Sequence, residues 1–590
     1  LAARLEESLE LVDGHLHEMH RELSRRTDLD LGPLDPIDLM FQRVDLAAHV
    51  DEDLFRTRVA FHALLHFPVH TLEERLREGG RWTREEWARS RMMDRFAERV
   101  PPPVLQGVSL ALRTADLYIS EYNISMGHLL DKDGSRPFPE GLRLISHWGL
   151  RDELRSHYDK GPEGHRKQRL IRTVMERIVR QEIPAAVRNA EVPWCPETNE
   201  ISRNGGGPGA AGQGREPDTR YAHLLSVFHA LRAVDPYTPT APTFIHRRFE
   251  QGREIHEDEA ERLIRSVLEA PEVDRLARRI EARLGRPLEP FDVWYSGYMP
   301  RAARSEEELD RVVRERFPTA EAFQRALPEL LRTLGFARER AAWLAERIVV
   351  DASRGAGHAL GAVRRGDRSH LRTRASGGGM SYKSFDTAAH ELGHCVEQVF
   401  SLDAIDHWSL SGVPNTAFTE AFAFTFQDRG LELLGYPPAG EEERRRDAFE
   451  ALWSTFEISG VALVDMRVWR WMYANPEASP ATLRDATVRI ARDVWNEFFA
   501  PRFGTRDCEI LAIYSHLIES ALYTPDYALG RIIAFQIAPR LRSGDFASEV
   551  ERMTRLGRLT PEAWMREATG TGLSAEPLLE EARAALQHED

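Results

Sequence analysis

The chain has 590 residues, of which 42% are hydrophobic, so it is long enough to bury a large core. Its formal net charge is -15, and no local run of basic residues offsets this value. Because an acidic surface repels phosphate, nucleic acid is excluded as an expected partner. No stretch approaches the roughly 18 uninterrupted apolar residues of a membrane span. These features predict a large globular protein.

The three cysteines, Cys195, Cys395 and Cys508, lie far apart in the sequence. Their spacing excludes a disulfide framework and a structural zinc site built from cysteine. Free thiols fit a reducing compartment, so a cytoplasmic location is favoured. Because the chain begins with "LAARLEESLE" and not with methionine, a removed leader would leave a periplasmic or secreted location open.

The first third of the chain is predicted to be almost wholly helical. Leucines recur at helical spacing over residues 1–23, and apolar residues do so between charges over 166–184. Residues 203–217 are dense in glycine and have no apolar period. We therefore predict an N-terminal helical lobe over 1–202, a Gly-rich loop or linker over 203–217, and a second region over 218–590. The two lobes are expected to interleave as one unit.

Strand signals in the second half are confined to two short segments, 347–352 ("RIVVDA") and 370–376 ("HLRTRAS"). Both precede a helical segment that contains the pentapeptide "HELGH", residues 390–394. The remainder reads as amphipathic helix, with no internal repeat. The predicted fold class is therefore mainly α, with one small β-sheet beside the "HELGH" helix.

The "HELGH" segment has the spacing of a metal site. Residues i and i+4 lie on one face of a helix, so His390 and His394 can direct imidazole nitrogens at one ion. Glu391 stands beside the first histidine, where its carboxylate can hold a zinc-bound water and accept that water's proton. A buried helix with two hydrogen-bonded histidines is the plainer alternative, so the third ligand decides between them.

Two residues compete for the third ligand position. The metzincin pattern places a histidine six residues after the second motif histidine, where this chain has Phe400. Glu420 is the only acid in the apolar run 416–427, where metal binding would offset the cost of burying it. Pro414 and Asn415 predict the start of this helix. Glu397 lies on the same helix as His394, where three ligands in a row fit a tetrahedron poorly. We therefore favour Glu420 and expect Glu397 to support the site or to lie at the surface.

With Glu420 26 residues after His394, the chain resembles the helical zinc peptidases of the thimet oligopeptidase and oligopeptidase F family, with a relation to angiotensin-converting enzyme. Three further segments, together spanning about 287–540, are similar to elements of that family: "PLEPFDVWYSGY", "GAGHALGA" and "HLIESALYTPDYALGRIIAFQI". The resemblance implies a two-lobed helical metallopeptidase with a deep central channel. One Zn²⁺ per chain would be held by His390, His394 and Glu420.

The last of these segments is similar to the family's histidine and two tyrosines, here His516, Tyr523 and Tyr527. Their intervals of seven and four predict one helical stripe that could face the metal, where a neutral donor would stabilise the oxyanion of an attacked carbonyl. Because Pro525 suggests a fresh helix start, we favour Tyr527 as the donor, with Tyr523 and His516 gripping the substrate. A core aromatic stripe is the alternative.

Two positions depart from angiotensin-converting enzyme. Tyr514 stands where that enzyme has a lysine for the substrate's terminal carboxylate, and Phe424 stands where it has an aspartate that supports the metal site. The orienting partner of the zinc histidines is therefore not evident from the sequence.

The sequence thus predicts a zinc-dependent oligopeptidase that hydrolyses short unfolded peptides, with the segment 370–376 as an edge strand that pairs with substrate. Two alternatives remain: a dipeptidyl carboxypeptidase, which the missing lysine argues against, and a catalytically inactive helical protein that binds peptides. The second is disfavoured because the motif histidines, Glu391 and Glu420 are all present. The oligomeric state is not predicted.

Overall fold

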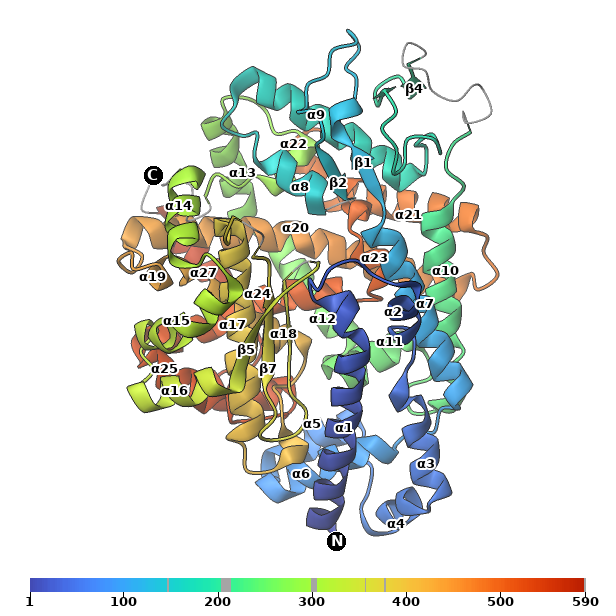
Figure 1. The fold of residues 1–590 in the computed structure, drawn as a ribbon, viewed down its shortest axis with the longest axis vertical. Helices are drawn as coiled ribbons and strands as arrows, with labels where there is room; N and C mark the ends of the chain where they lie inside the picture. The colour runs from blue at the N-terminus through green and yellow to red at the C-terminus, as the bar shows by residue number, and fades with distance from the viewer. Residues whose placement is uncertain (146–147, 203–213, 299–304, 356, 376–377, 588–590) are drawn as a thin grey trace.

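The computed structural model describes residues 1–145, 148–202, 214–298, 305–355, 357–375 and 378–587. Helices dominate this part of the chain, and its strands form two two-stranded sheets and one three-stranded sheet (Figure 1). The predicted mainly α fold class is confirmed. Among the described residues, no helix is both long enough and apolar enough to cross a bilayer. The Gly-rich segment predicted as a linker lies largely outside the described residues.

The predicted N-terminal helices are present. Helix α1 spans Ala2–Asp28, and α9 spans Gly161–Arg180 with its apolar side buried. Sequence reasoning missed two small antiparallel pairs in this region, β1 (Asn123–Ser125) with β2 (Arg143–Ile145) and β3 (Trp194–Cys195) with β4 (Glu200–Ile201). Each of these strands has only two or three residues. Segments this short carry no readable alternation of apolar and polar residues.

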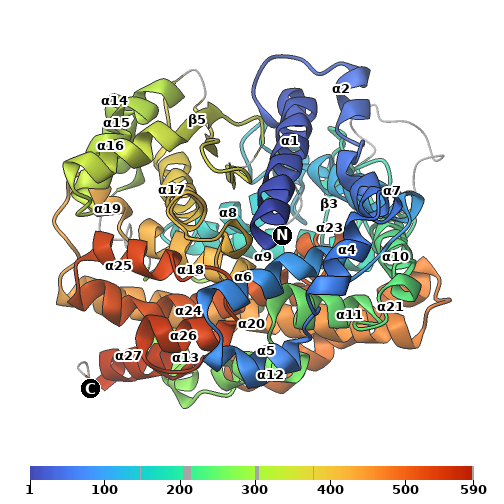
Figure 2. The same cartoon turned by 90° about the horizontal axis from the view of Figure 1, so that it is seen from below.

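The helices form one large core rather than one core per predicted region. Its buried side chains run from Trp87 to Leu586 along the chain. A smaller cluster joins the N-terminal helices to Leu402 and Trp408. Seen from below, α17 (Tyr382–Asp403) lies on one side of the molecule, α7 (Pro102–Ser120) and α10 (Thr219–Arg232) lie on the other, and α1 stands between them (Figure 2).

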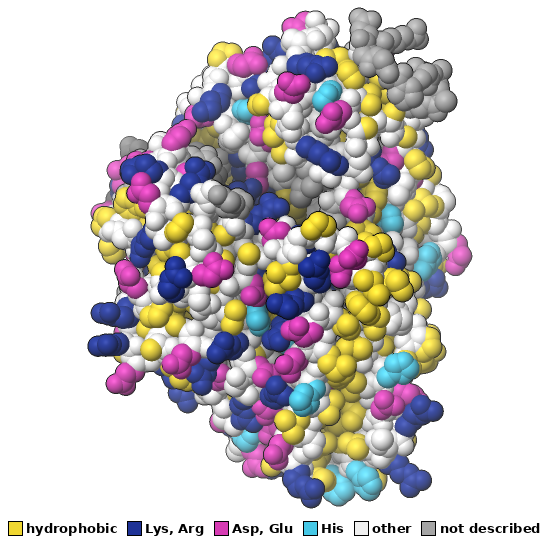
Figure 3. Space-filling model, viewed as in Figure 1, with side chains coloured by type: hydrophobic (Ala, Val, Ile, Leu, Met, Phe, Trp, Pro, Cys, Tyr) yellow, Lys and Arg dark blue, Asp and Glu magenta, His cyan; other side chains and the backbone are white. Residues whose placement is uncertain are grey.

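Four helices of the second half pack together in this core. Helix α18 (Thr416–Gln427) packs against α17 on one side and α24 (Thr524–Ser543) on the other, and α24 also packs on the long helix α20 (Glu441–Ala474). The apolar composition of α18 predicts that this helix is buried. The structure agrees, since nine of its twelve residues are buried. On the outer face in Figure 3, acidic and basic side chains are interspersed.

The three-stranded sheet lies beside α17, as the sequence predicts. Its strands are β5 (Ile348–Ala352), β6 (His358–Leu360) and β7 (Ser369–Thr373), in the order β5-β7-β6. Strand β7 pairs with β5 in parallel and with β6 antiparallel. The prediction that segment 370–376 is an edge strand is therefore wrong, because the short strand β6 occupies its free side.

Candidate metal centre

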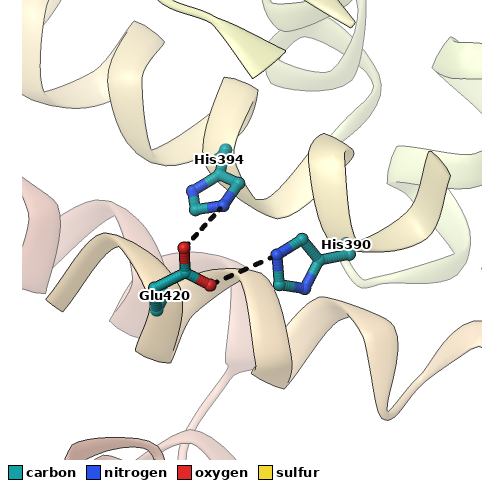
Figure 4. Close-up of side chains that lie close together, drawn as sticks. All are labelled: His390, His394 and Glu420. Carbon is teal, nitrogen blue, oxygen red and sulfur yellow. Dashed lines mark ion pairs between the residues drawn. The ribbon is translucent and has the colours of Figure 1, made fainter. Parts of the chain in front are cut away.

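The motif histidines lie in the middle of α17, which begins after the Ser381 cap, whose side chain accepts a hydrogen bond from the Ser384 amide. The facing helix α18 begins after Asn415, whose side chain caps the Ala417 amide, as the sequence predicts. Glu420 lies one turn into α18 and points toward both histidines of α17 (Figure 4). Two local helix signals thus position the three side chains.

The three predicted ligands converge. The Nε2 atom of His390 lies 3.4 Å from Oε2 of Glu420, and Nε2 of His394 lies 3.9 Å from Oε1 (Figure 4). All three potential ligand atoms lie within 4.8 Å of one another. Only 5% of Glu420 is exposed, and its Oε2 accepts no hydrogen bond from the described residues. Two imidazole nitrogens and a buried carboxylate oxygen with an open acceptor position fit Zn²⁺.

Two glycines allow the helices to approach this closely. A Cβ atom on Gly393, between the motif histidines, would lie 2.7 Å from the Cα of Ala423 in α18. A Cβ on Gly530 in α24 would lie 2.9 Å from the Cβ of Glu420. Both distances are shorter than real Cβ contacts, so these positions require glycine. The glycine within "HELGH" therefore permits the helix crossing that brings Glu420 to the histidines.

The charge state of the cluster suits a cation. Burial raises the pKa of the Glu420 carboxyl, but the neighbouring imidazoles of His390 and His394 and a hydrogen bond from Tyr523 together lower it to about 2. The Tyr523 hydroxyl donates to Oε1 at 3.0 Å. Burial lowers the pKa of His394 to about 4, so this imidazole is neutral near pH 7, as a metal ligand must be.

Glu391 is buried on the same helix. Burial and the negative charge of Glu420 raise its pKa, while the charge of His390 and a backbone hydrogen bond from Ala359 in β6 lower it, with a net result of about 7. A carboxyl that titrates near neutral pH is suited to accepting and returning a proton. The sheet thus contacts the site through Ala359, which sequence reasoning did not identify.

His390 is oriented by residues that sequence reasoning missed. Its Nδ1 lies 3.1 Å from Oε1 of Gln427, whose Nε2 donates to Asp386 at 2.7 Å. Because the amide oxygen can only accept, Nδ1 carries a proton, and Nε2 is the ring nitrogen that faces Glu420. Phe424 packs against the His390 ring at 5.3 Å. Gln427 lies seven residues after Glu420 in α18, and no motif marks it.

The aromatic segment is brought together, but not as one helical stripe. His516 begins the short helix α23 (His516–Glu519), Tyr523 precedes α24, and Tyr527 lies in its first turn after Pro525. The prediction of a stripe is wrong because the chain turns between the two helices, whereas the predicted helix start at Pro525 is confirmed. The three rings still contact one another, with centroids 5.2 to 5.6 Å apart. The hydroxyl of Tyr527 lies 3.5 Å from Nε2 of His516.

Glu397 lies outside the cluster. It is 1% exposed, and its Oε1 accepts a hydrogen bond from the Ser401 hydroxyl at 2.9 Å. Within the described residues, the side chains that lie close enough together to hold a metal are His390, His394 and Glu420, and Glu397 is not among them. The alternative that it lies at the surface is wrong, because the face of α17 that carries it packs into the core. Tyr514, in the position of the missing lysine, is likewise buried.

No family model and no curated protein matches the chain. Solved structures do. PZ peptidase A, in a complex with an inhibitor, is 14% identical, with a TM-score of 0.57 over 98% of this chain and 91% of that one. A putative oligoendopeptidase F from Bacillus anthracis is 13% identical (TM-score 0.53; 98% and 89%). The M32 carboxypeptidase from Deinococcus radiodurans is 13% identical (TM-score 0.53; 99% and 98%). The chain thus has a fold similar to helical metallopeptidases of two kinds.

Proposed function

We propose that the chain is a zinc-dependent metallopeptidase with His390, His394 and Glu420 as the metal ligands. The observation that carries this proposal is the convergence of two imidazole nitrogens on a buried, ionised carboxylate whose Oε2 has no hydrogen-bond donor among the described residues. Zinc bound there would act as a Lewis acid toward water and the peptide carbonyl. The relation to angiotensin-converting enzyme stays a prediction.

Two groups of the chain would handle protons and charge. Glu391 is one residue from a ligand, is buried, and has a pKa near neutrality, so it can take a proton from the attacking water and give it to the leaving amine. Tyr527 has a hydroxyl that burial keeps protonated, since its pKa lies well above the usual 10. It can therefore donate a hydrogen bond to the carbonyl oxygen as negative charge develops there, with His516 and Tyr523 gripping the substrate.

The proposed substrates are short unfolded peptides, because Glu420 and Glu391 are buried within a helical body and the two histidine ligands are only partly exposed. The first candidate activity, based on the resemblance, is cleavage inside the peptide, as by an oligopeptidase. Release of residues from the C-terminus is the second candidate, favoured by the nearly complete mutual coverage with the M32 carboxypeptidase. The predicted central channel remains part of this proposal.

Metal content and peptide cleavage test the function together. Purified protein is expected to hold about one zinc per chain and to cleave a quenched peptide. A chelator should abolish cleavage, and added zinc should restore it. Mass spectrometry of the products then distinguishes internal cleavage from removal of C-terminal residues. Stoichiometric zinc without any cleavage would favour the inactive peptide-binding alternative, and protein that binds no zinc would contradict the proposal.

A further inference from the structure

An arginine from the first third of the chain lies next to the aromatic segment of the candidate metal centre. Helix α8 (Trp148–Arg155) carries Trp148, whose ring contacts that of His516 edge-on at 5.4 Å. The guanidinium of Arg151, one turn later, stacks on the Trp148 ring at 4.4 Å. A continuous wall of side chains therefore runs from the metal ligands through Tyr523 and His516 to Arg151.

The charge of Arg151 is felt in the site. Burial lowers the pKa of His516 to about 4, and the positive charge of Arg151 lowers it further while Glu420 opposes this. Burial raises the pKa of the Tyr527 hydroxyl, and the positive charge of Arg151 acts in the opposite direction. Arg151 and these two side chains are thus near enough for direct electrostatic interaction. An anionic group placed between Arg151, His516 and Tyr527 would meet the positive charge of this guanidinium.

Arg151 has an incomplete set of partners. Its nearest carboxylate is that of Asp152, at 3.7 Å, and the other oxygen of Asp152 is bound by Lys383. The Tyr514 hydroxyl shares a hydrogen bond with it, whereas its Nε is buried and has no hydrogen-bond partner among the described residues. A charged donor left without a partner is costly, so it marks a place for an anion.

The side chain of Arg151 is also reachable, because 18% of it is exposed. We propose that Arg151 binds the C-terminal carboxylate of the peptide substrate beside His516 and Tyr527, so that the enzyme prefers peptides with a free C-terminus. This inference rests on the proposed peptidase function. A planar guanidinium can bind both oxygens of a carboxylate, and the Trp148 ring beneath it fixes its plane. The substrate class is therefore peptides cleaved near their C-terminus.

The first test compares one quenched peptide in two forms, with a free C-terminal carboxylate and with a C-terminal amide. A charged hydrogen-bonded contact predicts that native protein cleaves the acid with a kcat/KM about tenfold to a hundredfold higher. Arg151→Gln should reduce this preference to near unity by slowing only the acid, and Arg151→Lys should retain part of it. Equal cleavage of both peptides by native protein would overturn the proposal without any variant.

Lys383 supplies the matched control. Its ammonium group binds the same Asp152, but its side chain is 65% exposed. Lys383→Gln removes one positive charge from the same neighbourhood, so it separates direct binding from a general field effect. The preference for the acid should survive in Lys383→Gln. If Lys383→Gln and Arg151→Gln reduce it equally, Arg151 is not a specific anchor.

Binding to metal-free protein separates this inference from the proposed function. A fluorescently labelled peptide with a free C-terminus should bind the metal-free native protein about tenfold more tightly than its amide, measured by anisotropy. Arg151→Gln should bind both forms with equal affinity. A binding preference in a protein that never cleaves peptide would refute the peptidase function and keep Arg151 as a carboxylate site. No preference in binding would refute the role of Arg151, whatever the activity.

Discussion

Two buried glutamates on neighbouring helices have opposite chemical states. Glu420 on α18 and Glu397 on α17 are 5% and 1% exposed, and each has one carboxylate oxygen without a hydrogen bond from the described residues. Glu420 faces two histidines and a tyrosine hydroxyl, which lower its pKa to about 2 in spite of burial. Glu397 has only the Ser401 hydroxyl, and burial raises its pKa to about 7.

The difference teaches that burial alone does not make a metal ligand. Removal from water disfavours the charged form of any carboxyl, so a buried glutamate stays ionised only where cationic groups and donors offset that cost. Around Glu420, the motif histidines and the Tyr523 hydroxyl offset the cost. Around Glu397, only the Ser401 hydroxyl is available, and it does not offset the cost. The predictions below test whether function follows this division.

Glu391 provides the largest expected effect, since it lies within the Glu420 cluster but contributes no ligand atom. Glu391→Gln removes the proton acceptor while keeping the side-chain shape. Turnover should fall by about a hundredfold to ten-thousandfold, with zinc content and melting temperature nearly unchanged. Steady-state kinetics beside metal analysis decides the outcome. Loss of zinc in this variant would instead indicate that Glu391 is a metal ligand and contradict its role as the proton acceptor.

Replacing Tyr527 and replacing Tyr523 should have different effects on turnover and zinc binding. Tyr527→Phe removes a donor to the developing oxyanion, so turnover should fall by about a hundredfold while the Michaelis constant and melting temperature change little. Tyr523→Phe removes the hydrogen bond to Glu420 and serves as the matched variant. Its main expected effect is weaker zinc binding. If both variants keep turnover within a few-fold and lose only stability, the aromatic cluster is core.

Gln427 sharpens the account of His390. Gln427→Ala removes the acceptor that keeps the proton on Nδ1 of His390, so Nε2 is less often free to bind zinc. Zinc affinity should therefore fall by about tenfold to a hundredfold. Competition with a chromogenic chelator measures this affinity directly. Gln398→Ala is the control, because this glutamine of α17 is neither a ligand nor hydrogen-bonded to one, and it should keep the zinc affinity. Unchanged affinity in both variants would remove Gln427 from the site.

Glu397 gives the smallest effect, and it concerns stability. Its folded pKa of about 7 lies above the ordinary 4.5, so the folded state holds a proton that the unfolded state releases. Stability from this group is therefore present at low pH and is lost as pH rises between these two values, by about 3 kcal/mol. Glu397→Gln should accordingly gain stability relative to native protein at pH 8 but not at pH 5, in denaturant unfolding. An equal difference at both pH values would refute the raised pKa.

Sequence reasoning reached the parts of the site that local rules encode. The i, i+4 spacing of His390 and His394 and the isolated acid Glu420 in an apolar helix are visible because they follow from helix geometry and the cost of burial. The Asn415 cap and the new helix at Pro525 are visible for the same reason. These features need no knowledge of distant segments.

The remaining features depend on packing between distant segments. Gln427 reaches His390 only because α17 and α18 cross at Gly393, and Trp148 contacts His516 although the two are far apart in the sequence. The central place of β7 depends on β6, a strand of three residues with no alternating pattern. The depth of Glu397 follows from the same crowding around α17. None of these contacts leaves a periodic or compositional signal in one sequence.

Zinc stoichiometry of a matched pair of variants tests the central claim most directly. Glu420→Gln and Glu397→Gln each replace one buried carboxyl by an amide of nearly the same shape, on facing helices. After dialysis against limiting zinc, elemental analysis should find near-full occupancy in Glu397→Gln and severe loss in Glu420→Gln. Full occupancy in Glu420→Gln together with loss in Glu397→Gln would contradict the account and make Glu397 the third ligand.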